Sequence, residues 1–396
     1  MLSRILTSGA SMLAAVGVAV APTAAGQTVR SLGPGRVIVP TPSMDLGYVT
    51  PPMFPLADGG TLFLDSIDKR LLRAGGATRA LQQIGSDGEG PGQFRHPSGL
   101  WTRNDSLVLT DQALRRASVF GVRDPSFVGS WSVGLATSFR GLAVRPIAAF
   151  SQSCWIGVST RGSTRPRTER MIPTVDVIVL VTEAGTDIRV DSLLAVEMAD
   201  FYVHPLGTIR GNRRRSVTGT FPRLALSPSG DAFAVVEVAA GAKPAISIQY
   251  VTDPCRTPAR TVTVSVATRE LSMREMREIY EKRLWVGDAI PGLPPMQERV
   301  DDAIEQTRRT NGRFIAPLFS DAFMDREGNV WVEVEGDREV ADFGRPRRWT
   351  VVDPGGRVTA EYSTPADVRL QTAGYGRVLG WRTGEDGGSV VEFRLP

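Results

Sequence analysis

Short apolar segments recur along the whole chain, and turns rich in glycine and proline separate them. In several segments apolar and polar residues alternate, as in Thr61–Asp65, Ser106–Asp111 and Thr261–Val266. Alternation of this kind predicts strands with a buried face, and the intervening turns predict hairpins. The 41 glycines and 27 prolines are residues that many tight turns need. The pattern therefore predicts an all-β chain.

Two hairpins repeat at a fixed distance. Asp65 and Asp111 each end a strand and lie 46 residues apart, and Arg70 and Arg116 keep the same spacing five positions later. A repeat of this length is expected of propeller blades with four strands each.

The stretch Gly85–Leu100 leads into the second of these hairpins. Its glycine-rich loop, Phe94 and the run Pro97-Ser-Gly-Leu precede the strand that ends at Asp111, and a basic turn follows. This succession resembles one repeat of the six-bladed β-propellers of the NHL-repeat type. The resemblance covers about one blade and implies six four-stranded blades around a central channel.

The remaining strands group into units of similar size. These units span Phe139–Val196, Arg223–Val266 and Phe314–Tyr362. Only three strands follow at the C-terminus, and Val37–Val39 can supply the fourth, which closes the ring and removes an exposed edge. We therefore expect a six-bladed β-propeller closed by an N-terminal strand. The prolines between Pro40 and Pro55 predict a loop after that strand.

One stretch has a helical period instead. Met276 and Tyr280 recur at helical spacing, and Ser272 with Glu275 forms a capping box. A second helix is expected over residues 296–309, which places a helical hairpin at about 270–310, between blades 4 and 5. This insertion could cap the channel or dock a partner, but its apolar face is expected to pack on the propeller.

The N-terminus has the pattern of an export signal. Arg4 precedes the apolar run Ile5–Ala21, and Ala24 and Gly26 fit the small residues of a cleavage site. We expect residues 1–26 to be a signal peptide and residues 27–396 to form the propeller, in the periplasm or secreted. No later stretch is long and apolar enough for a transmembrane span, so none is expected after signal cleavage.

Charge and cysteine content narrow the expected partners. The chain carries 46 basic and 42 acidic side chains, for a net charge of +4. The electrostatic field of so small a net charge is too weak to favour binding of nucleic acid. Cys154 and Cys255 either form a disulfide, which export permits, or remain two separate thiols.

Few residues suggest catalysis. The amidating lyases, whose propellers resemble NHL repeats, hold zinc through histidines, and this chain has only His96 and His204. Neither lies in a nucleophile motif such as G-x-S-x-G. Calcium in the channel is the one cofactor that the residues allow, because it needs only oxygen ligands. The candidate ligands are Asp65, Asp111, Asp321 and Asp325. Asp65 and Asp111 are expected instead to pair with Arg70 and Arg116 in their own hairpins.

Two predicted connections are rich in arginine. They contain Arg161, Arg165, Arg167 and Arg170, and Arg210, Arg213, Arg214 and Arg215. If both emerge from one face of the propeller, their guanidinium groups form a surface that suits carboxylate or phosphate groups. The alternative is that they are solvated loop residues.

These observations favour a non-catalytic binding or scaffold protein that recognises a protein or an anionic polymer of the cell envelope. The alternative is a divalent-metal-dependent lyase or lactonase with its site in the central channel. Carboxylates that converge on the channel would favour the enzyme, because the fold alone does not decide function.

Overall fold

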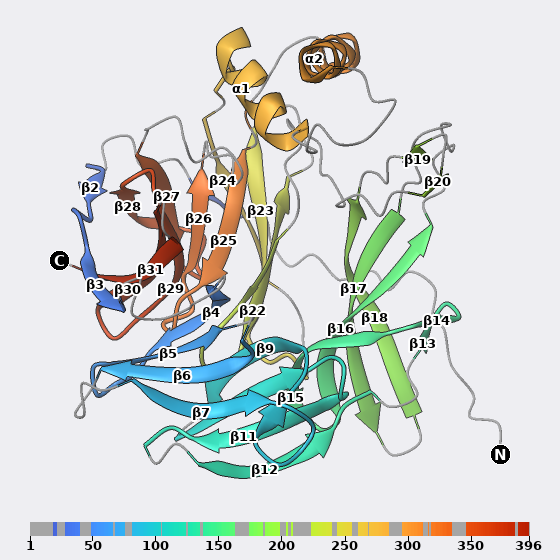
Figure 1. The fold of residues 1–396 in the computed structure, drawn as a ribbon, viewed down its shortest axis with the longest axis vertical. Helices are drawn as coiled ribbons and strands as arrows, with labels where there is room; N and C mark the ends of the chain where they lie inside the picture. The colour runs from blue at the N-terminus through green and yellow to red at the C-terminus, as the bar shows by residue number, and fades with distance from the viewer. Residues whose placement is uncertain are drawn as a thin grey trace.

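The computed structural model shows six sheets of strands around a ring, with two helices at its edge (Figure 1). It describes residues 19–21, 28–39, 49–65, 68–75, 81–103, 105–123, 126–134, 138–162, 174–184, 187–198, 203–204, 207–208, 223–239, 244–255, 260–267, 269–284, 295–311, 316, 318–334, 346–384 and 387–395. The prediction of an all-β, six-bladed propeller is confirmed.

Each blade contains four antiparallel strands. Blade 1 has β4 (Val49–Pro55), β5 (Gly60–Asp65), β6 (Arg70–Gly75) and β7 (Gln82–Asp87), followed by the short β8 (Gln93–Phe94). Blade 2 has β9 (Pro97–Arg103), β10 (Ser106–Asp111), β11 (Arg116–Gly121) and β12 (Phe127–Ser132). Blade 3 has β15 (Arg145–Ser151), β16 (Cys154–Gly162), β17 (Thr174–Ala184) and β18 (Asp187–Met198).

The other three blades follow the same plan. Blade 4 has β21 (Arg223–Leu226), β22 (Phe233–Val238), β23 (Ala245–Val251) and β24 (Arg260–Ser265). Blade 5 has β25 (Phe319–Met324), β26 (Val330–Val334), β27 (Arg347–Val352) and β28 (Val358–Thr364). Blade 6 has β29 (Val368–Gly374), β30 (Arg377–Gly384), β31 (Gly387–Arg394) and β3 (Arg36–Val39). Two short hairpins lie outside the blades, β13 (Ser138–Phe139) with β14 (Leu142–Ala143) and β19 (Val203–His204) with β20 (Gly207–Thr208).

The ring closes between the two ends of the chain. β3 pairs antiparallel with β31, where Arg36 lies opposite Glu392 and its Nη2 is 2.8 Å from that carboxylate. The predicted closure by an N-terminal strand is therefore confirmed. Two further N-terminal segments, β1 (Ala19–Ala21) and β2 (Arg30–Ser31), add parallel strands to the outer edges of blades 4 and 5.

Two predicted loops contain strand instead. Pro51, Pro52 and Pro55 lie in β4, which pairs only with β5, so its other edge needs no backbone donor. A bulge also interrupts the ladder at the first two of these prolines. Gly85 belongs to β7, where a Cβ atom would lie 2.8 Å from the ring of Phe94. Close packing, rather than a loop conformation, therefore accounts for this glycine.

The repeat seen in the sequence extends to the backbone. Lys69 and Arg115 occupy the same position in their turns, and each has a φ angle of 49°. Asp65 pairs with Arg70 at 2.8 Å, as predicted. The predicted pairing of Asp111 with Arg116 is wrong. The Arg116 guanidinium donates instead to three backbone carbonyls of the preceding connection, because that connection folds over the turn. The acceptors are Glu89 O (2.7 Å), Gly90 O (2.8 Å) and Gln93 O (2.5 Å).

Apolar side chains fill the spaces between neighbouring blades. Between blades 5 and 6, the rings of Trp331 and Tyr362 stack at 5.1 Å between centroids, and Trp349 packs in the same cluster. The space between blades 2 and 3 holds Trp155, which is fully buried. Burial of aromatic surface in these spaces joins each blade to the next.

A disulfide joins Cys154 to Cys255, with 5.7 Å between their Cα atoms. Cys154 begins β16 of blade 3, and Cys255 lies in the turn after β23 of blade 4. Of the two alternatives that the sequence left open, the structure contains the disulfide.

The helical insertion lies between blades 4 and 5, as predicted, and consists of α1 (Met273–Leu284) and α2 (Met296–Asn311). Ser272 donates from N and Oγ to Glu275 Oε2, each at 2.8 Å, so the capping box is confirmed. Burial alone would raise the pKa of Glu275, but the hydrogen bonds from Ser272 and from Arg269 outweigh it and lower that pKa to about 2.

The helical insertion has a hydrophobic core that is separate from those between the blades. Its buried apolar cluster includes Met276 and Ile279 of α1 and Val300 and Ile304 of α2, and none of its members lies in a blade strand. The expectation that this apolar face packs on the propeller is therefore wrong for the residues described, because the two helices cover each other. Neither helix is long and apolar enough to cross a membrane.

Candidate functional site

The connections between strands leave the ring on two faces. In every blade, the turn between the second and third strands and the connection to the next blade lie at one end. The helical insertion is one of these connections, so we call this side the helical face. The opposite side, which carries the other two turns of each blade, is the hairpin face.

The hairpin face is closed by contacts across the ring. Thr102 of blade 2 donates from its backbone N to the Pro228 carbonyl of blade 4 at 2.6 Å. Arg326 of blade 5 donates from Nη1 to Thr102 Oγ1 at 3.2 Å. Blades 2 and 4 are not neighbours in the ring, so these turns meet over the axis. These contacts cover the axis of the ring on the hairpin face.

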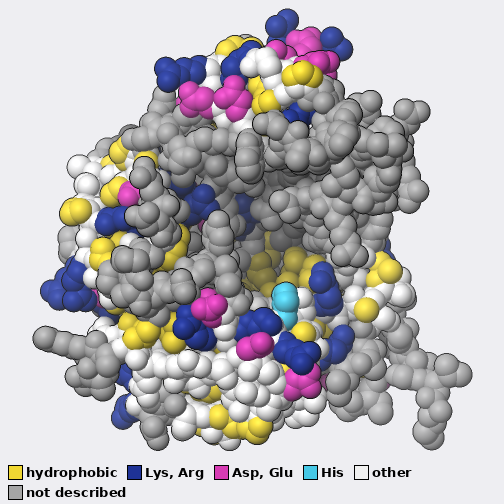
Figure 2. All heavy atoms as spheres, in the orientation of Figure 1, with side chains coloured by type: hydrophobic (Ala, Val, Ile, Leu, Met, Phe, Trp, Pro, Cys, Tyr) yellow, Lys and Arg dark blue, Asp and Glu magenta, His cyan; other side chains and the backbone are white. Residues whose placement is uncertain are grey.

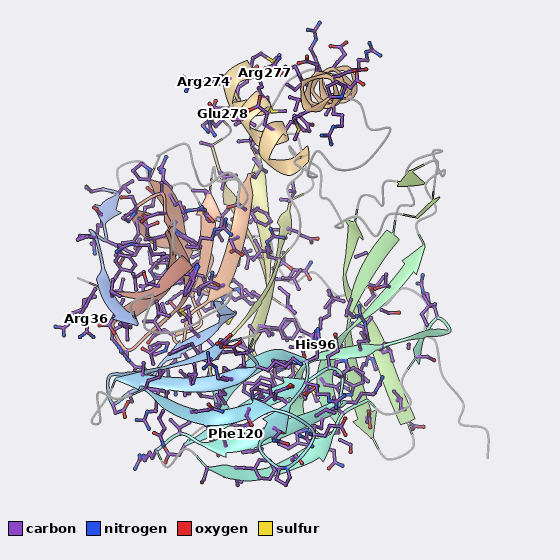
Figure 3. All side chains as sticks on the ribbon, in the orientation of Figure 1. Arg36, His96, Phe120, Arg274, Arg277 and Glu278 are labelled. Carbon is purple, nitrogen blue, oxygen red and sulfur yellow. A yellow bond between two sulfur atoms is a disulfide. The ribbon has the colours of Figure 1, made fainter. Side chains whose placement is uncertain are left out.

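Figure 2 shows a hollow near the middle of the molecule, with apolar side chains inside it and basic side chains, some acidic ones and a histidine around its edge. His96 is the histidine whose side chain the structure describes, and Figure 3 places it toward the middle of the ring. It lies in the connection from blade 1 to blade 2, which belongs to the helical face. The hollow therefore opens on that face.

Asp111 organises the edge of this hollow. Its fully buried carboxylate accepts hydrogen bonds from the backbone N of Arg95 (2.6 Å), His96 (3.3 Å) and Leu114 (2.8 Å). These bonds hold the connection that contains His96 against the turn that contains Arg115.

Arg115 extends this basic edge to blade 3. Its Nη2 donates to the Val144 carbonyl at 3.3 Å, and the next residue, Arg145, begins β15. Arg145 and His96 are both exposed. Within the described part of the chain, neither the Arg145 guanidinium nor the His96 ring has a hydrogen-bond or ion-pair partner. We call His96, Arg115 and Arg145 the basic rim.

The basic rim is suited to anions. A guanidinium group offers planar, paired donors that match carboxylate and phosphate oxygens. Neighbouring arginines are already engaged, because Arg116 serves three carbonyls and Arg95 lies 2.9 Å from the Glu89 carboxylate. Arg145 and His96 are therefore the rim residues whose donors are free among the described residues.

Most of the predicted arginines lie outside the described residues. Arg161 lies in β16 opposite Val175, but the position of its side chain is not described. Those outside the described residues are Arg165, Arg167, Arg170, Arg210, Arg213, Arg214 and Arg215. Thr174 pairs with both Gly162 and Met198, so the two connections begin at one end of blade 3, on the helical face.

The candidate calcium ligands do not gather. Asp65 pairs with Arg70, Asp111 accepts backbone amides, and Asp321 lies 3.8 Å from the Arg223 guanidinium. The fourth, Asp325, lies in a turn of the hairpin face. No group of three or more His, Cys, Asp or Glu side chains that could hold a metal occurs among the described residues. The described residues therefore contain no cluster of side chains that could hold a catalytic metal ion.

The buried carboxylate of Asp325 is hydrogen-bonded within its own hairpin. It accepts hydrogen bonds from Asn329 N (2.8 Å), Asn329 Nδ2 (2.9 Å) and Trp331 Nε1 (2.9 Å). Burial raises its pKa, and these hydrogen bonds act against that rise.

The sequence pattern did not identify Arg115 and Arg145 as site residues. The repeat contained a signal for the first, because a basic residue follows the strand-ending aspartate by four positions in both hairpins, as Lys69 and Arg115. Arg145 gave no such signal, since its place next to the Arg115 contact depends on how blade 3 packs against blade 2.

No protein-family model matches the chain, and no curated protein matches it in sequence. Membership of the NHL-repeat family is therefore not shown. Among solved structures, the chain is similar to a putative exported protein from Bacteroides fragilis, with 12% identity over 91% of this chain and 94% of the other and a TM-score of 0.40. It is also similar to a calcium-binding protein, regucalcin, from Agrobacterium tumefaciens, with 12% identity over 93% and 96% and a TM-score of 0.34. A third is BamB from Moraxella catarrhalis, with 10% identity over 84% and 81% and a TM-score of 0.29. Likeness at this level carries no argument about function.

Proposed function

We propose that this chain is an exported binding protein that holds carboxylate or phosphate groups of an envelope polymer or protein on its helical face. The observation that carries the proposal is the basic rim, where Arg145, at the start of the innermost strand β15, and His96 are both exposed on the helical face. A cationic edge beside a concave surface is the arrangement that anionic groups fit, and this one needs no metal or nucleophile.

Two further features support the proposal. The predicted arginine connections begin at the end of blade 3 that carries Arg145, so they can add cationic groups to the same face. Export agrees with the predicted signal peptide over residues 1–26 and with the disulfide, because disulfides persist in oxidising compartments.

The proposal is tested with the mature chain, from Gln27 onward, and poly-L-glutamate as a carboxylate polymer. Binding is measured by calorimetry for the wild type and for Arg115→Gln/Arg145→Gln. Exposed ion pairs contribute about 0.2–1 kcal/mol each, so we expect the double variant to bind about tenfold more weakly. Raising the salt from about 50 mM to about 300 mM should weaken binding by the wild type more than by the variant, because screening acts on the pairs that the variant lacks.

The matched control is Arg123→Gln. Arg123 is also exposed, at 84% of its side chain, but it lies after β11 on the hairpin face. It should bind as the wild type does. Equal losses in Arg123→Gln and in the double variant, or no binding by the wild type, would contradict the proposal.

A further inference from the structure

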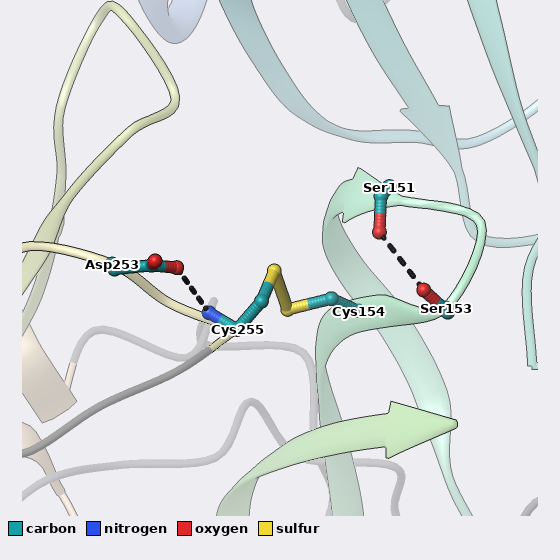
Figure 4. Close-up of a disulfide and its surroundings, with 5 residues drawn as sticks. All are labelled: Ser151, Ser153, Cys154, Asp253 and Cys255. Carbon is teal, nitrogen blue, oxygen red and sulfur yellow. Dashed lines mark hydrogen bonds between the residues drawn. A yellow bond between two sulfur atoms is a disulfide. The ribbon is translucent and has the colours of Figure 1, made fainter. Parts of the chain in front are cut away.

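The boundary between blades 3 and 4 is tightly packed at its hairpin-face end. Cys154 and Phe233 are the first residues of their strands, and Val251 is the last residue of β23, so all three lie near that end. The rings of Phe150 and Phe233 stack there at 6.2 Å between centroids, and the disulfide crosses the boundary beside them (Figure 4).

A row of side chains on blade 3 leads from the basic rim into this boundary. Arg145 pairs with Val158 across β15 and β16, and Val158 pairs with Ile178 across β16 and β17. Directly paired residues project from the same face of a sheet, so these three side chains form one row. The row lies on the face toward blade 4, because Ile178 packs against the cluster shared by blades 3 and 4.

The far end of this row is apolar and incompletely covered. Val158 is 8% exposed, and Ile178 is half-buried. Leu224 of β21, on the facing side of blade 4, packs against the same cluster and is also half-buried. Figure 2 shows apolar atoms inside the hollow, next to basic ones. The Arg145 guanidinium therefore lies at one end of an apolar strip between blades 3 and 4. We call Val158, Ile178 and Leu224 the strip.

We propose that this strip binds the hydrocarbon chain of a single-chain amphiphile whose carboxylate head group is held by Arg145. The inference deepens the proposed function, because it rests on anion binding at the basic rim and adds the chemistry of the chain attached to the anionic group. A free anion or a hydrophilic polyanion would leave Ile178 and Leu224 in contact with water, whereas an alkyl chain covers them. Charge complementarity fixes the orientation, with the carboxylate at Arg145 and the chain leading outward along the row, from β15 toward β17.

The first test uses the wild-type mature chain and unbranched fatty acids of increasing length, below their micelle concentrations. Each buried methylene contributes a nearly constant transfer free energy, so affinity should rise about three- to fourfold per methylene until the strip is filled. An affinity that does not change with chain length overturns the inference. Poly-L-glutamate, measured in parallel, separates the two proposals. If it binds through Arg145 while the fatty acids show no length dependence, anion binding stands and the amphiphile is excluded. If neither ligand binds, both proposals fail.

The second test places a polar group in the strip. Ile178→Asn should remove most of the chain-length dependence while binding of a short carboxylate such as butyrate is unchanged. Ile188→Asn is the matched control, since Ile188 is also half-buried on blade 3 but packs toward blade 2. Equal effects of the two substitutions overturn the inference. If near-ultraviolet circular dichroism shows that Ile178→Asn does not fold, Leu224→Gln tests the opposite wall in the same way, and the wild-type length series decides the matter without any substitution.

Discussion

Removal of the disulfide should destabilise the propeller chiefly through the unfolded chain. The bond between Cys154 and Cys255 spans 101 residues and joins two neighbouring blades. Closing a loop of that size lowers the entropy of the unfolded chain and corresponds to about 4–5 kcal/mol of stability at 25 °C. Cys154 is 1% exposed within an apolar cluster, so its replacement by alanine adds a packing loss of about 1 kcal/mol.

The two contributions are separated by urea unfolding of three samples, followed by tryptophan fluorescence. These are the oxidised wild type, the reduced wild type and Cys154→Ala/Cys255→Ala. The reduced wild type keeps both sulfur atoms and loses only the cross-link, so it should show most of the decrease in the unfolding free energy. A thiol assay confirms the reduction. If the oxidised and reduced proteins unfold at the same urea concentration, the argument from chain entropy is refuted.

Three further substitutions test other parts of the structure. Glu275→Gln should reduce hydrogen-exchange protection of α1 by about 1 kcal/mol, because glutamine can still accept from Ser272 but loses the charge-assisted hydrogen bonds of the carboxylate. The pKa of Glu275 is lowered to about 2, so the stabilisation of α1 by its carboxylate is fully present above the ordinary carboxyl pKa of about 4.5 and is lost as the pH falls toward 2. The protection of α1 in the wild type and in Glu275→Gln should therefore become equal near pH 2. Glu333→Gln should cost about 3–5 kcal/mol in urea unfolding, because it leaves the buried guanidinium of Arg347 without its ion pair. Gly230→Ala, at a φ of 66° against the Trp101 indole, should lower the unfolding temperature, and urea unfolding should show a loss of about 2–4 kcal/mol.

Each of these substitutions has a contradicting outcome. A difference between wild type and Glu275→Gln that stays constant down to about pH 2 would show that the carboxylate charge is not its source. A loss under about 1 kcal/mol in Glu333→Gln would mean that the pair is solvated. Gly59→Ala is the control for Gly230→Ala, because Gly59 also has a positive φ, 84°, but no atom within 4 Å of a Cβ. Equal losses at the two glycines would mean that contact with the indole contributes nothing.

Much of the fold could be predicted because each blade is a local repeat. The spacing of Asp65 and Asp111 reflects two turns with the same backbone and the same aspartate bonds, so it is visible in the sequence. Closure through Val37–Val39 could be inferred by counting strands, because the C-terminal blade would otherwise have only three strands. The capping box at Ser272 was likewise a local feature.

The features that could not be predicted depend on contacts between distant parts of the chain. β4 was missed because its prolines are tolerated only on an edge strand or at a bulge, and no local pattern shows which strand lies at an edge. The disulfide was left open because its two cysteines become neighbours only through the packing of blades 3 and 4. Arg116 was assigned the wrong partner because its guanidinium reaches carbonyls that lie 23 to 27 residues earlier in the chain.

The sequence predicted the type of residue and of ligand at the candidate site, but not the residues that form it. The sequence indicated arginine and an anion, and it pointed to connections around blade 3. Of those residues, only Arg161 falls within a described strand. The rim that the structure assembles combines Arg115 of one blade with Arg145 of the next, through a bond from the first guanidinium to the carbonyl before the second. A contact of this kind between neighbouring blades cannot be predicted from a local sequence pattern.

The central claim, that anions bind at the basic rim, is tested most directly by hydrogen exchange of the mature protein with and without saturating poly-L-glutamate. The account predicts slower exchange in segments 95–98, 112–116 and 144–147, which form the basic rim, and no change in the hairpin-face turns at 228–230 and 354–357. Slower exchange in those turns, or on α1 and α2 alone, would place the anion elsewhere and contradict the claim.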